Sequence, residues 1–138
     1  MPVPANVTSQ QTLQIGVNGP GDVTSMYVIS GIAQIGLGAF AQPNQFQTQQ
    51  ATFVAHIGPQ LTAAQFRRAI ASASIASLSL QGEGTFDAWS LSSIGADFDD
   101  DAGSVELEFD VSVSVTAGPQ GAGLATGGIG FQVLILTT

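Results

Sequence analysis

The sequence predicts a mostly β fold, a two-layer antiparallel β-sandwich or a barrel-like arrangement, with one short α-helix near residues 62–73. Two patterns favour this class. Apolar and polar residues alternate strictly over residues 105–115, as in a strand with one face in a core and one in water. Residues 131–136 are apolar in both phases except Gln132, which is typical of a central strand covered on both faces. Strands of both kinds indicate two packed layers around one core.

The length of 138 residues fits a single domain. Residues 1–11 hold two prolines and polar residues without periodicity, so we expect a flexible N-terminal arm there. Residues 12–138 are expected to form one β-sandwich domain. Its first strands are predicted at 13–17 and 23–29, joined by a turn at 18–21.

Two further strands are predicted before the helix, at residues 31–40 and 51–57. The segment between them, residues 42–50, is polar and contains Pro43, so it is predicted to be a surface loop. The first is a buried strand loosened by three glycines. In the second, Phe53, Ala55 and Ile57 share one face, and His56 shares the other face with Val54.

The predicted helix begins after Pro59. Thr62 takes the N-cap position and Gln65 follows three residues later, which is the spacing of a capping box. Leu61 and Phe66 take the two positions of a hydrophobic staple. The apolar residues that then recur at helical spacing are Ala63, Phe66, Ala69, Ile70 and Ala73.

After the helix, residues 75–80 are predicted to return to a strand. The alternation phase changes between Leu91 and Ile94, which predicts a β-bulge near Ser92 and Ser93. The segment 118–130 is rich in glycine and is predicted to be a loop.

An acidic hairpin is the strongest chemical signal in the chain. Seven of the ten acidic residues lie between positions 97 and 110: Asp97, Asp99, Asp100, Asp101, Glu106, Glu108 and Asp110. Keeping Phe98 and Val105 on one face requires a four-residue turn at 100–103. That register places Asp97 directly opposite Glu106, with Asp99 on the same face and diagonal to Glu106.

Two interpretations of the hairpin stay open. In the first, the acids form a solvated β face and a polar turn that keep an edge soluble. In the second, a calcium ion binds Asp97, Asp99, Asp101 and Glu106, since calcium accepts six to eight oxygen ligands in irregular geometry. Calcium would offset the repulsion between carboxylates that face each other across the strands.

The charge balance excludes several classes of partner. Only 9% of residues are charged, against about 25% in ordinary soluble domains. With ten acids, two arginines and no lysine, the chain lacks the cations that nucleic-acid binding needs. No apolar run approaches the roughly 20 residues of a membrane-spanning helix, so we expect no membrane insertion.

The residues of common enzyme sites are also missing, so we expect no enzymatic activity. The chain has no cysteine and no lysine, which excludes thiol and Schiff-base chemistry. His56 is the only histidine. No nucleophile motif accompanies it, and we interpret it as a hydrogen-bonded structural residue.

A surface built from amides, hydroxyls and glycine has little charge to keep copies apart. We therefore expect a structural subunit that self-associates or joins other assembly subunits, as in a virion, tail, surface layer or filament. The alternative is a calcium-assisted binding module for carbohydrate or another surface ligand. No cofactor is expected beyond the calcium of that alternative. Residues 1–6 show no signal-peptide pattern, and a virion or cell-surface location is consistent with either function.

Overall fold

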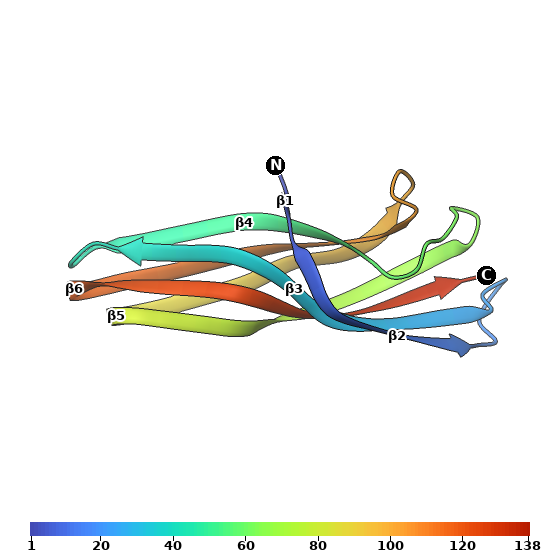
Figure 1. The fold of residues 1–138 in the computed structure, drawn as a ribbon, viewed down its shortest axis with the longest axis horizontal. Coiled ribbons are helices and arrows are strands. Elements are labelled where there is room, and N and C mark those ends of the chain that lie inside the picture. Colours follow the sequence, from blue (N-terminus) through green and yellow to red (C-terminus); the bar gives the residue numbers. More distant parts are fainter.

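The computed structural model describes residues 1–138, about 80% of which lie in six β-strands (Figure 1). All six strands belong to one sheet, in the order β1-β4-β6-β3-β2, and β5 pairs with β6 outside this path. Every pair is antiparallel except the short parallel pair β1–β4. The strands are β1 (Val3–Pro4), β2 (Asn6–Gly16), β3 (Ser25–Ala41), β4 (Phe46–Ile57), β5 (Phe66–Asp99) and β6 (Ser104–Thr137). The predicted predominance of β-structure is therefore confirmed.

The sheet curls over on itself into an open half-barrel (Figure 1). The first half of β6 lies between β4 and the second half of β5, and we call these three strand segments, with β1, the acidic half-sheet. The second half of β6 lies between β3 and the first half of β5, and we call these segments, with β2, the apolar half-sheet. The two half-sheets meet where β5 and β6 bend and where β3 turns into β4.

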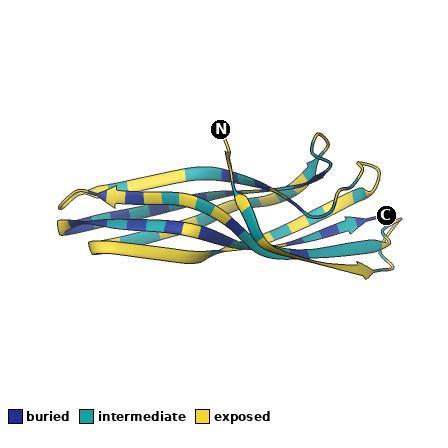
Figure 2. Cartoon of the chain, viewed as in Figure 1, coloured by how far each residue is buried: buried dark blue, intermediate teal, exposed yellow.

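The core lies between the inner faces of the two half-sheets. The alternation predicted over residues 105–115 is confirmed, because all six odd-numbered positions are buried. Phe109 stacks on Phe53 of β4 with ring centroids 5.9 Å apart. Across the core, Ile129, Val133 and Ile135 of the second half of β6 are also fully buried in the same cluster. Figure 2 shows the buried positions concentrated on β6 and its neighbours.

The half-barrel is open along β5. At one end Phe66 and Phe98, from the two halves of β5, stack with ring centroids 5.4 Å apart. Toward the bend no such pair closes the edge, and Leu80 and Trp89 remain 63% and 54% exposed although their partners on β6 are buried. The β5 strand therefore borders the sheet along its whole length, paired on one side only.

The predicted loop at 118–130 is wrong, because β6 continues through it. The residues from Gly123 to Gly130 pair with β3 and β5, except Gly127, which lies at a register shift. Residues 118–121 interrupt the ladder where the sheet bends. Gly82 and Gly121 have φ angles of +73° and +78°, which L-residues with side chains rarely adopt. These glycines therefore allow β5 and β6 to bend and do not mark a loop.

The predicted helix near 62–73 is also wrong, since the chain contains no helix. The capping interaction does form: the Gln65 side chain accepts a hydrogen bond from the Thr62 backbone N–H at 2.9 Å. It closes a single turn, and β5 begins at Phe66. Ala69, Ala71, Ala73 and Ile75 also fit a period of two, and as a strand they pair with β6 and pack against the core cluster.

The first residues of the chain are paired to the sheet. The segment 1–11, predicted as a flexible arm, contains β1 and the first half of β2, which hydrogen-bond to β4 and β3. Ala5 and Val7 pack against the core cluster. The surface loop predicted at 42–50 is shorter than expected, because β4 already begins at Phe46. No helical segment capable of crossing a membrane is present.

Candidate functional site

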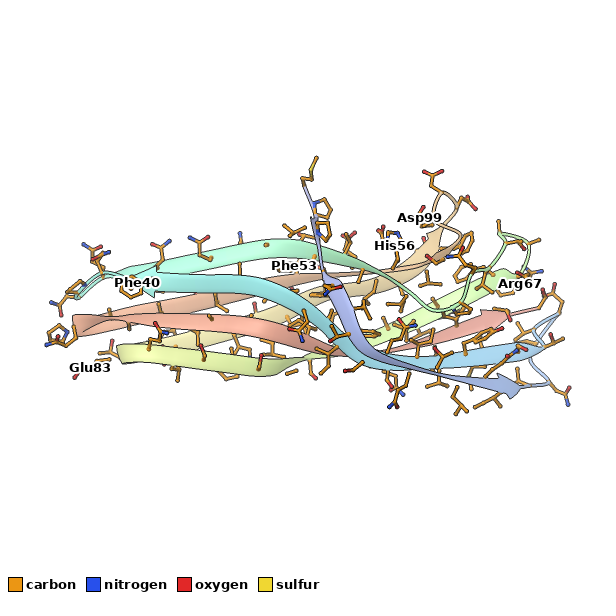
Figure 3. The ribbon with its side chains drawn as sticks, viewed as in Figure 1. Phe40, Phe53, His56, Arg67, Glu83 and Asp99 are labelled. Atoms are coloured by element: carbon orange, nitrogen blue, oxygen red, sulfur yellow. The ribbon has the colours of Figure 1, made fainter.

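Three metal-ligating side chains converge on the outer face of the acidic half-sheet. Strict alternation places Glu106 outside, between the buried Val105 and Leu107, and the register pairs it with His56 of β4. The Nε2 atom of His56 lies 2.8 Å from an Asp99 carboxylate oxygen and 3.4 Å from a Glu106 carboxylate oxygen. Figure 3 shows His56 and Asp99 together near the end of the molecule that also carries Arg67.

The hairpin turn at 100–103 fixes Asp99 at this place. Its second carboxylate oxygen accepts a hydrogen bond from the Asp101 backbone N–H at 3.0 Å, and its carbonyl oxygen accepts one from Gly103 at 2.8 Å. The pKa of Asp99 is lowered below its usual value, mainly by the hydrogen bond with His56. The hydrogen bonds from backbone N–H groups lower it further. Asp99 is thus a carboxylate held in position from both sides.

The predicted hairpin geometry is confirmed. Phe98 pairs with Val105, Asp97 pairs with Glu106, and residues 100–103 form the turn. The predicted bulge is found between Ser92 and Gly95.

Of the four predicted metal ligands, the structure brings Asp99 and Glu106 together. Asp97 is exposed, and its carboxylate accepts a hydrogen bond from the Phe98 backbone N–H. Asp101 lies exposed in the turn. The third member of the cluster is His56, and the side-chain donor atoms of the three residues all lie within 4.8 Å of one another.

Sequence reasoning missed His56 as a partner of the acidic hairpin. It predicted a hydrogen-bonded structural histidine, and the hydrogen bond with Asp99 is present. The available signal was the phase of residue 56, which faces outward beside Val54 while Phe53, Ala55 and Ile57 face the core. The phase shows on which face of the strand His56 lies, but only the pairing of β4 with β6 shows that Glu106 is its neighbour.

A shallow polar groove lies farther along the same outer face. It is lined mainly by hydroxyl and amide groups on β4, β5 and β6: Gln50, Thr52, Ser90, Ser92 and Ser112. Asp110 supplies a carboxylate, which accepts a hydrogen bond from the Thr52 hydroxyl. This arrangement offers donors and acceptors to a ligand rich in hydroxyl groups.

The strand segments of the apolar half-sheet contain no acidic residue. The registers align Leu13 of β2, Val28 of β3, Leu134 of β6 and Ile70 of β5 in one row that crosses the half-sheet from edge to edge. The two end residues, Leu13 and Ile70, are 59% and 48% exposed. We call these four residues the apolar row. It brings large apolar side chains to both free edges of the same half-sheet.

Comparison with known proteins gives no match to a family model, to a curated protein or to a solved structure.

Proposed function

We propose that the protein is a non-enzymatic structural subunit that self-associates by pairing the β2 edge of one copy with the β5 edge of the next. The observation that carries the proposal is the apolar row, which ends in an exposed Leu13 at one free edge and an exposed Ile70 at the other. Placing a second copy alongside would set Ile70 next to Leu13 of the neighbour. The row would then continue across the junction, and both side chains would lose contact with water.

Strand direction favours this head-to-tail contact. The apolar half-sheet has four antiparallel strand segments, so its two border strands, β2 and the first half of β5, run in opposite directions. A copy shifted sideways without rotation therefore presents an antiparallel β2 to β5. The ladder would be extended with the same hydrogen-bond pattern as inside the sheet.

The absence of charged residues on both edges also favours the head-to-tail contact. Strand β2 has no charged residue, and β5 has none from Ala69 to Gly82. Natural proteins protect exposed edges with charged side chains, proline or bulges, because an unpaired edge is a template for further pairing. These two edges are protected only by a bulge in β2 between Thr8 and Gln11 and by small bulges in β5.

The contact is heterologous, joining two different surfaces, so it generates a ring or an open chain of subunits rather than a closed dimer. This is the geometry of a filament, shell or layer component, the class that the low charge of the sequence predicts.

Charged substitutions at the two ends of the apolar row test the proposal. Leu13→Lys and Ile70→Lys each remove one binding edge, and each is expected to reduce the mass of the wild-type assemblies measured by light scattering. Because the two variants keep opposite edges intact, an equimolar mixture should form dimers, whereas each variant alone stays monomeric. Dimers in the mixture would show that two different edges meet.

Phe86→Lys is the matched control. Phe86 is 59% exposed but lies on the acidic half-sheet, outside the apolar row, so this variant should assemble like the wild type. Equal assembly of all three variants would contradict edge pairing. Loss of assembly in Val28→Lys alone would instead indicate contact through the face of the half-sheet.

A second candidate function rests on the polar groove of the acidic half-sheet. Its hydroxyl and amide lining beside Asp110 suits a calcium-assisted site for a carbohydrate or another hydroxyl-rich surface ligand. Calorimetric titration with soluble oligosaccharides, with and without calcium, tests it. Binding that is lost in Ser92→Val and kept in Phe86→Lys would support the groove, and no heat with any sugar would exclude it for those ligands.

A further inference from the structure

We propose that His56, Asp99 and Glu106 form a binding site for a divalent transition-metal ion of the zinc type. The proposal goes beyond self-association and does not depend on it. It also differs from the calcium site predicted from the hairpin, because the imidazole of His56 replaces the carboxylates of Asp97 and Asp101 as the third ligand.

The spacing of the donor atoms fits such an ion. Zinc binds histidine nitrogen and carboxylate oxygen at about 2.0–2.2 Å in tetrahedral geometry, which separates neighbouring ligand atoms by about 3.3 Å. The His56 Nε2 atom is 2.8 Å from Asp99 and 3.4 Å from Glu106, and no donor pair of the three residues is more than 4.8 Å apart. Small rotations of partly exposed side chains bring all three to the required separation.

One of the two short contacts between His56 and the carboxylates has no proton to form a hydrogen bond. The Nε2 atom of an imidazole carries at most one proton, so it donates to only one of the two carboxylates that face it. A metal ion at this position accepts electron pairs from the nitrogen and both carboxylates at once. It also offsets the negative charge of the hairpin, whose seven acids have no arginine or lysine among them.

The imidazole selects the class of ion. Calcium and magnesium take oxygen ligands, while imidazole suits zinc, copper, iron and nickel. Three protein ligands leave at least one coordination position for water or for a group from outside the chain.

The ligands come from three places in the fold. His56 is on β4, Asp99 ends β5 and Glu106 lies near the start of β6, so a bound ion links the hairpin turn to the neighbouring strand. We therefore expect the ion to stabilise the fold as well as to bind.

Zinc titration of the tag-free protein tests the site, with calorimetry for binding and thermal unfolding for stability. The expected result is saturable binding of one ion per chain and a higher Tm in zinc. His56→Gln, Asp99→Asn and Glu106→Gln should each weaken zinc binding by at least about tenfold. The control variants Asp97→Asn and Asp101→Asn remove carboxylates from the same hairpin and should bind zinc like the wild type. Substituting Co²⁺ should give a visible absorption band that is absent in His56→Gln.

Three results would overturn the proposal. They are the absence of zinc binding by the wild type, unchanged binding by His56→Gln, and a loss in Asp97→Asn or Asp101→Asn as large as in the ligand variants. If the last result were found and calcium bound as strongly as zinc, the metal ligands would be the carboxylates of the hairpin turn. None of these results depends on whether the protein self-associates, because all are measured per chain.

Discussion

At the scale of single residues, the pair Phe53–Phe109 joins β4 and β6 at the centre of the core. Phe109 is fully buried, so Phe109→Ala should lower the free energy of unfolding by about 3–5 kcal/mol, through lost burial and the cavity left behind. Urea unfolding followed by fluorescence measures this. Phe46→Ala is the matched control, because Phe46 is 59% exposed and its truncation should cost under about 0.5 kcal/mol. Equal losses in the two variants would contradict the assignment of the core.

One ion pair gives the chain a local pH dependence. Arg67 donates from Nε and Nη2 to the two carboxylate oxygens of Asp22, at 2.9 and 2.6 Å, and this hydrogen bonding lowers the pKa of Asp22 below its usual 3.8. Since the folded pKa lies below the unfolded one, the pair stabilises the fold above pH 3.8. That contribution is lost as the pH falls through the lowered pKa.

The prediction is that Arg67→Gln raises the pKa of Asp22 toward 3.8. An NMR titration of the Asp22 side-chain carboxyl carbon in both proteins measures it. Arg68→Gln is the control, because Arg68 makes no ion pair. An Asp22 pKa unaffected by Arg67→Gln would show that the pair does not form in solution.

At the scale of elements, the bend of β5 and β6 depends on glycine. Gly82 has a φ of +73°, and a Cβ atom there would collide with the Gly121 carbonyl oxygen. Gly82→Ala should therefore destabilise the protein by at least about 1–2 kcal/mol in denaturant unfolding. Gly36→Ala is the control, because no atom lies within 4 Å of its added Cβ and its φ is unstrained. A Gly82→Ala protein as stable as the control would mean that the bend tolerates side chains.

Elements defined by local patterns were predictable from the sequence. The alternation over 105–115 and the chemistry of the turn at 100–103 together specify the hairpin, its register and the facing of Asp97 and Glu106. The helix failed for a non-local reason. The stretch from Ala69 to Ala73 satisfies both periods, and pairing with β6, more than fifty residues later, decides between them.

The candidate metal site could be predicted only in part for the same reason. Asp99 and Glu106 come from one hairpin, so turn geometry brings them together. His56 reaches them through the pairing of β4 with β6, which no local pattern specifies. The glycines of 118–130 led to the wrong prediction of a loop. They lie where β5 and β6, the two strands of one long hairpin, bend together, and the sequence of one strand alone does not distinguish such a bend from a loop.

At the scale of the whole molecule, the two half-sheets divide the surface by chemistry. The outer face of one carries Glu106, Glu108 and Asp110, and the outer face of the other carries the apolar row. The acidic face stays in water in the proposed assembly. The β2 and β5 edges lie on opposite sides of the apolar half-sheet, and His56 and Glu106 lie on strands of the acidic half-sheet that take no part in the proposed contact.

The most direct test is the mass distribution of the tag-free wild-type protein by sedimentation velocity over a wide concentration range, in chelator so that metals play no part. Edge pairing predicts a weight-average mass that rises with concentration well above the 14.0 kDa of one chain, with a series of species rather than one dimer. A single 14.0 kDa species at every concentration would contradict self-association. A single discrete dimer would contradict the head-to-tail contact.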